Sequence, residues 1–177
     1  AAFKNLDAAI GLLDSFDQEV FDKVMRREDR VDRFEDRLGA YLVRLHTRQL
    51  SEHETQTSAR ILTCLSNVER ISDHAVNLSE LAQELAGKKI RFSPQALEEL
   101  GICTDAIREI ALLTRQAMEE ETPASAHLVE PLEEVIDQLT RELKASHVQR
   151  VQSGRCTLEL GFIFNDCINN FERVADH

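Results

Sequence analysis

The stretch Asn67–His74 reads NVERISDH, and 103 residues further along the chain the stretch Asn170–His177 reads NFERVADH. Five of the eight positions are identical, and the other three exchange one apolar or small side chain for another. A match of this quality at a fixed offset indicates an internal duplication. We therefore expect two copies of one structural unit.

A weaker companion repeat lies ahead of each copy. Glu28 and Asp32 are four residues apart, as are Glu133 and Asp137, and the two pairs are separated by 105 residues, nearly the same offset. Residues i and i+4 share one face of an α-helix, so each pair presents two carboxylates side by side. A single pair of this kind is common on solvated helices, and only its recurrence in both halves makes it informative.

The composition is typical of long helices. The 177 residues include only 6 Gly and 3 Pro. Apolar residues recur at helical spacing, and Ser51 with Glu54, and Ser93 before Pro94, mark helix starts. The expected helices cover residues 3–13, 20–50, 52–86, 94–121 and 158–177. A connection is expected to start at Thr122 and Pro123 and to lead to a fifth helix that carries Leu132 through Val151 and is broken at Ser153 and Gly154. This pattern predicts an all-α fold made of two antiparallel three-helix bundles, with one repeat at 1–90 and the other at 91–177.

The net charge of −11 argues against a nucleic-acid partner, because phosphate contacts need clustered Lys and Arg. It suits a metal or another cationic partner, although it can also serve solubility alone. No run approaches the roughly 18 apolar residues of a membrane span. The sequence begins without Met and ends within a helical pattern, so we expect a soluble piece of a longer protein.

Cys64 and Cys167 lie on apolar stripes and are expected in the core.

The acidic pairs suggest a metal site. Two such helices packed antiparallel would bring four carboxylates within a few ångströms, which either raises their pKa values or recruits a cation. Oxygen ligands suit hard or borderline ions, so Fe, Mn, Mg, Ca and Zn are the candidates. We predict one such site in each repeat.

An equally weighted alternative is that Arg70 and Arg173, next to the acids, neutralise them as ion pairs. We expect His74 and His177 either to hydrogen-bond to the metal ligands or to lie on the helix surface, rather than to bind the metal directly. Asn77 continues the Glu69–Asp73 face and could orient a carboxylate or a water molecule.

At these residues the sequence resembles the PhoU-like family, which carries an acid followed four positions later by Asp on helices of two three-helix repeats. Residues 40–51, 67–74, 147–154 and 161–166 look most like the cytosolic C-terminal domain of bacterial sodium/phosphate cotransporters. By position, the resemblance implies eight metal ligands. They are Glu28, Asp32, Glu69, Asp73, Glu133, Asp137, Glu172 and Asp176. Ser72 and Ala175 stand where close relatives commonly have Gly, and both are small enough to preserve the packing.

The resemblance implies a metal-binding regulatory or coupling domain of a sodium-dependent phosphate transporter, acting in phosphate uptake or homeostasis. Its main partner would be a membrane transporter portion of the same polypeptide, on the cytoplasmic side of the inner or plasma membrane. A second copy of the chain and phosphate are further candidate partners. The alternatives are a helical interaction scaffold without metal and a carboxylate-cluster phosphohydrolase. No nucleophile or Gly-rich loop accompanies the acids, so we expect no enzyme and no catalytic residues.

Overall fold

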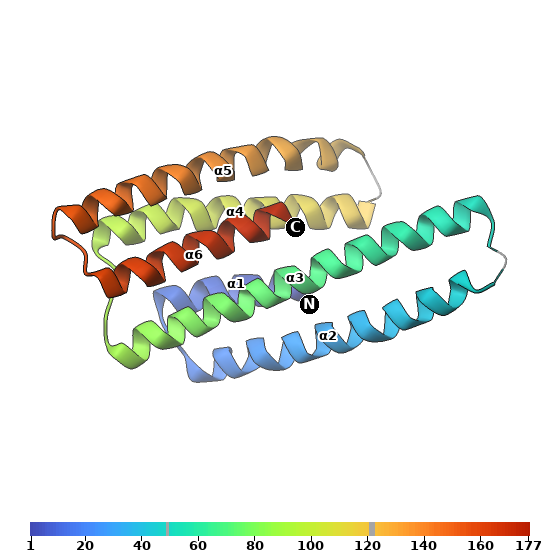
Figure 1. Cartoon of the computed structure of the whole chain (residues 1–177), viewed down its shortest axis with the longest axis horizontal. Coiled ribbons are helices and arrows are strands. Elements are labelled where there is room, and N and C mark those ends of the chain that lie inside the picture. Colours follow the sequence, from blue (N-terminus) through green and yellow to red (C-terminus); the bar gives the residue numbers. More distant parts are fainter. Residues whose placement is uncertain (49, 121–122) are drawn as a thin grey trace.

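The computed structural model describes residues 1–48, 50–120 and 123–177, and within these ranges every regular element is an α-helix (Figure 1). The six helices are α1 (Ala2–Asp14), α2 (Gln18–His46), α3 (Glu52–Lys88), α4 (Pro94–Glu120), α5 (Pro123–Gln152) and α6 (Leu158–Asp176). The predicted all-α class and helix order are confirmed. The expected end of the fourth helix at Glu121 and the expected start of the connection at Thr122 lie outside the described ranges, whereas Pro123, expected in the connection, begins α5.

The helix starts follow the predicted capping residues. Ser51 and Glu54 form a capping box, in which the Ser51 amide donates to Glu54 Oε2 at 2.8 Å and the Glu54 amide donates to Ser51 Oγ at 3.3 Å. Ser93 Oγ accepts from the Ala96 amide at 3.2 Å at the start of α4. The end of α3 differs from the expectation, because Gly87 stays helical and Lys89 takes the left-handed conformation with φ of 55°.

The helices form two layers of three. Helices α1, α2 and α3 make one bundle and α4, α5 and α6 the other, with α3 and α6 in contact where the bundles meet (Figure 1). One apolar core runs through both bundles, and it includes the buried residues Ile10, Leu78, Ile107, Ile136 and Phe164. The two repeats therefore stabilise each other through a shared interior.

The second half of α2 and the first half of α3 extend beyond the other helices as a two-helix projection (Figure 1). Cys64 lies on this part of α3 and is exposed, so its predicted core position is wrong, whereas Cys167 on α6 is fully buried as expected. The helical stripe of Cys64 continues past the end of the core that it would have faced. Among the described residues, no helix is both long and apolar enough to cross a membrane.

Candidate metal centre

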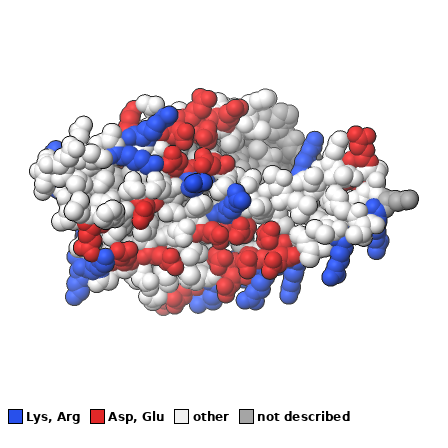
Figure 2. All heavy atoms as spheres, in the orientation of Figure 1, with Lys and Arg blue, Asp and Glu red and all other residues white. Residues whose placement is uncertain are grey.

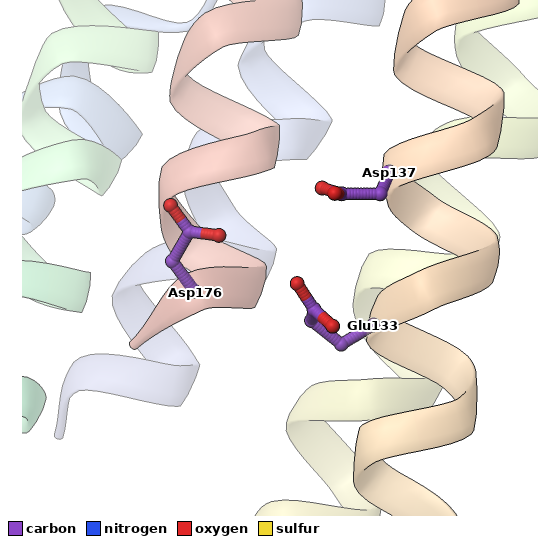
Figure 3. Close-up of side chains that lie close together, drawn as sticks. All are labelled: Glu133, Asp137 and Asp176. Atoms are coloured by element: carbon purple, nitrogen blue, oxygen red, sulfur yellow. The ribbon is translucent and has the colours of Figure 1, made fainter.

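Three carboxylates from α5 and α6 converge in the second bundle. Glu133 and Asp137 lie one turn apart on α5, and Asp176 lies at the end of α6. One oxygen of each side chain lies within 4.8 Å of the others. Figure 3 shows the three side chains pointing toward one another across the space between the helices. Across residues 1–48, 50–120 and 123–177, no other trio of His, Cys, Asp or Glu meets this spacing.

The surroundings of this trio favour a cation. Burial raises the pKa of Glu133, and the charges of Asp137 and Asp176 raise it further. Glu133 and Asp176 also border a cavity of about 330 Å³ that Glu130 and His177 help to line. Glu130 was not predicted, although it lies three residues before Glu133 on the same side of α5. The trio thus offers negative charge beside open volume in which further ligands could complete a coordination shell.

Glu172, expected as the fourth ligand here, lies outside the trio. Its Oε2 is 2.6 Å from Lys144 Nζ, an ion pair between α6 and α5. The lysine neutralises the carboxylate, so the repulsion that would recruit a cation is already relieved at this position.

The first bundle gathers acids less tightly. Glu69 has its pKa raised to about 7, first by burial, then by the charge of Asp73 and a hydrogen bond to it, and then by Glu35 and Asp32. Burial also raises the pKa of Glu28, with Asp73 as the main charge. All four predicted residues are therefore electrostatic neighbours. Glu35 joins them unpredicted, one turn beyond Asp32 on α2.

The surface view shows the acids of the two bundles as separate groups. Figure 2 shows one gathering of Asp and Glu side chains over α5 and another over α2 and α3. Helices α2 and α3 supply the first-bundle acids and α5 and α6 the second-bundle trio, as antiparallel neighbours in each case. This arrangement agrees with the predicted pairing of acidic helices.

The two arginines next to the motifs do not clasp the acids. Within the described part of the chain, neither Arg70 nor Arg173 has a carboxylate oxygen within 4.0 Å. Arg70 instead lies near His177, whose pKa is lowered first by burial and then by the Arg70 charge. An ion pair therefore does neutralise one of the predicted ligands, Glu172, but its partner is Lys144. Arg70 and Arg173, which the alternative named, do not make this pair.

The two histidines and Asn77 join the copies of the motif to each other. The rings of His74 and His177 stack with centroids 5.8 Å apart and planes at 17°. His74 Nδ1 lies 2.9 Å from Asn170 Oδ1, and Asn77 Nδ2 donates to the same oxygen at 3.2 Å. Asn77 therefore orients Asn170 across the α3–α6 contact, where we had expected it to orient a carboxylate.

Ser72 shows why the motif needs a small residue before its Asp. It is fully buried, and its Oγ accepts a hydrogen bond from Asn5 Nδ2 at 3.3 Å. The same Asn5 nitrogen donates to the Val24 carbonyl at 3.1 Å. Asn5 thus ties α1 to both acid-bearing helices of the first bundle and fixes their spacing.

A pair of three-helix bundles, each with acids on two facing helices, defines a class of duplicated all-α protein with acidic centres between helices. Residues 1–82 match the family model described as PhoU domain. A relative from Thermotoga maritima, named phosphate-specific transport system accessory protein PhoU homolog 1, is 25% identical over 187 aligned residues, which cover 98% of this chain and 75% of the relative.

The fold is also found in a solved structure. The crystal structure of PhoU from Pseudomonas aeruginosa superimposes with a TM-score of 0.91 at 18% sequence identity, covering 99% of this chain and 84% of that one. The likeness confirms the predicted fold class. At this level of identity it carries information about the fold alone.

These comparisons correct the expected partner. The matched relatives are PhoU proteins in their own right, one of them named an accessory protein, and the match takes in 75% and 84% of their lengths. The expectation of a membrane transporter portion in the same polypeptide is therefore wrong, and the closer resemblance to sodium/phosphate cotransporter domains finds no support among the matches. The acidic repeat identifies the helical bundle, but it does not tell whether a membrane transporter portion is attached to that bundle.

Proposed function

We propose that this chain is a regulatory accessory protein of phosphate transport whose action depends on metal ions bound between its helices. Two similarities support the transport role: the match of residues 1–82 to the PhoU domain model, and the similarity along 98% of the chain to a relative named as such an accessory protein. The convergence of Glu133, Asp137 and Asp176 supports the metal dependence.

The second-bundle trio is the stronger of the two proposed sites. Its three carboxylates match the oxygen ligands that Mg²⁺, Mn²⁺, Ca²⁺ and iron prefer, with Zn²⁺ as a further candidate. The raised pKa of Glu133 means that a proton and a cation compete for the same oxygens. A bound divalent ion would hold α5 against the end of α6, because its ligands come from both helices.

We propose a second, weaker site in the first bundle, held by Glu28, Asp32, Glu69 and Asp73 and assisted by Glu35. Its support is the raised pKa of Glu28 and of Glu69, to which burial and then the charges of Asp73 and Asp32 contribute across α2 and α3. Each site belongs to one of the proposed repeats, 1–90 and 91–177. Filling both sites would reduce the net charge of −11 by several units and brace two helix pairs, which changes the surface that a transporter or regulator meets.

Metal binding is tested with chelator-treated protein titrated with Mn²⁺, Mg²⁺ and Fe²⁺ by calorimetry, followed by elemental analysis after dialysis. The trio is removed in Glu133→Gln/Asp137→Asn. The control Glu134→Gln/Glu142→Gln removes two exposed acids from the same helix and makes the same change in charge. We expect the first variant to lose the tighter site and the control to keep it. Equal metal content in all three proteins would refute the site.

The transport role is tested in bacterial cells that lack their own PhoU protein. The chain is expected to restore normal phosphate uptake, and Glu133→Gln/Asp137→Asn to restore it poorly at equal protein level. Full restoration by this variant would separate the transport role from metal binding. Hydrolysis of a phosphomonoester by the metal-loaded protein, lost in the same variant, would instead support an enzyme.

A further inference from the structure

A cavity of about 170 Å³ lies between the start of α4, the end of α5 and the start of α6. All three helices reach the same end of the second bundle (Figure 1). This cavity is remote from the metal site proposed in the second bundle, because α6 separates Thr157 from Asp176 by 19 residues, or about 28 Å of helix. Its chemistry is also opposite to that of the metal site.

The lining of this cavity is cationic in a chain dominated by acids. Three arginines, Arg91, Arg150 and Arg155, border it together with His147, and none of its lining residues is Asp or Glu. The whole chain has 32 acids against 21 Lys and Arg. Arg91 and Arg155 are exposed, and within the described ranges neither has a carboxylate oxygen within 4.0 Å. Their charge is therefore available to a ligand.

Two buried nitrogens at this cavity have no hydrogen-bond partner. The Arg150 side chain is only 4% exposed, and its Nη1 donates to Glu99 and to Ser146 Oγ, while its Nη2 has none. His147, also buried, has an unpartnered Nδ1. Buried polar side-chain atoms are normally paired, and these two unpartnered nitrogens, which belong to residues bordering one cavity, are both available to pair with a polar ligand there. Phe164 holds the guanidinium in place, with Cζ 4.9 Å from the ring centroid.

Two helix N-termini add positive potential at the same place. Ser93 and Thr157, the capping residues of α4 and α6, both line the cavity. Helix N-termini carry partial positive charge and bind anions through free amides. The opposing C-terminus of α5 is already satisfied, because the Gly154 amide donates to the Val151 carbonyl at 3.0 Å and the Arg155 amide donates to the Arg150 carbonyl at 2.9 Å.

We propose that this cavity binds a tetrahedral oxyanion of the phosphoryl class, with Arg91 and Arg155 closing over it and Arg150 and His147 at its base. Arginine suits this role because its planar fork pairs with two oxygens of one phosphoryl group. The ligand source is either free inorganic phosphate or the phosphoryl group of a small ester. The proposal does not depend on the metal sites.

The test is calorimetric titration of chelator-treated protein with inorganic phosphate, and separately with glycerol 3-phosphate. We expect saturable one-to-one binding that weakens at least tenfold in Arg91→Gln/Arg155→Gln, whose exposed positions leave the fold intact. The control Arg37→Gln removes an exposed arginine from α2 and should change affinity less than twofold. Tighter binding of the ester than of phosphate would identify the larger molecule as the source.

A second measurement reports on the base of the cavity. The imidazole of His147 has its pKa lowered by burial and by Arg150, and a bound oxyanion would raise it, shifting its NMR resonances on titration. Absence of saturable binding by either probe overturns the proposal, as does unchanged affinity in the double variant. Binding seen only after metal loading, and lost in Glu133→Gln/Asp137→Asn, would overturn it too by placing the anion on the metal.

Discussion

Lys144 Nζ lies 2.6 Å from Glu172 Oε2, and this ion pair excludes Glu172 from the group formed by Glu133, Asp137 and Asp176. Both partners are 33% exposed, so the pair is partly shielded from water. Glu172 and Asp176 share one face of α6 and are equivalent by sequence. The structure separates them, because Glu172 contacts a lysine of α5, whereas Asp176 lies beside two acids of that helix.

The first prediction separates these two acids by their effect on metal affinity. For chelator-treated protein titrated with Mn²⁺, we expect Asp176→Asn to weaken the second-bundle site about tenfold or more, or about 1.4 kcal/mol. Glu172→Gln should change the affinity by less than about threefold, since its carboxylate is already paired with Lys144. Equal losses in the two variants would return Glu172 to the ligand set.

The second prediction concerns pH and Glu69, whose pKa rises from its ordinary 4.5 to about 7 in the fold. Between pH 4.5 and about 7 the folded chain keeps a proton on Glu69 that the unfolded chain has lost. The free energy of unfolding contributed by this group is therefore highest at acidic pH and is lost as the pH rises through 7. We expect this group to lower the free energy of unfolding by about 1 kcal/mol from about pH 5 to about pH 8, after allowing for solvent screening.

Urea unfolding of metal-free protein measures this effect. The difference between the native chain and Glu69→Gln isolates the contribution of this one carboxyl from all other titrations. A native chain that gains stability relative to Glu69→Gln over the same pH interval would contradict the direction of the shift.

The third prediction concerns Ser72, which accepts from Asn5 at 3.3 Å within the core. Ser72→Gly removes this hydrogen bond and places glycine inside a helix, so we expect a loss of about 1–2 kcal/mol in the free energy of unfolding. The control is Ala175→Gly at the equivalent position of the other motif, one residue before the end of α6, where the cost should stay below about 0.5 kcal/mol. Equal costs would mean that the contact with Asn5 contributes nothing.

The fourth prediction concerns Gly161, which is packed against His147. A Cβ at this position would lie 3.0 Å from His147 Nε2, so Gly161→Ala should lower the free energy of unfolding by about 1–3 kcal/mol. Gly101→Ala in α4 is the control, because nothing lies within 4 Å of its Cβ, and it should be neutral or stabilising by up to about 1 kcal/mol. Thermal unfolding compares the two. A neutral result for Gly161→Ala would show that His147 moves aside freely.

The features that were predicted correctly depend on neighbours along one helix. The capping pair Ser51 and Glu54 and the break at Gly154 act within a few residues, so their outcome needs no tertiary information. Gly87 shows the limit of such rules, since the chain turns two residues later at Lys89. Cys64 shows another limit, because a helical stripe does not tell where the core ends.

Helical period and internal repetition can be read along one chain segment, so they predict a duplicated all-helical protein with paired acids on two helices of each half. Which of these acids meet depends on how the helices pack. An i,i+4 spacing fixes the face of one helix, but the axial shift and rotation between α5 and α6 place Asp176 with the acids and Glu172 with Lys144. The same holds for the cationic cavity, whose residues come from three separate segments and converge only when the helices pack.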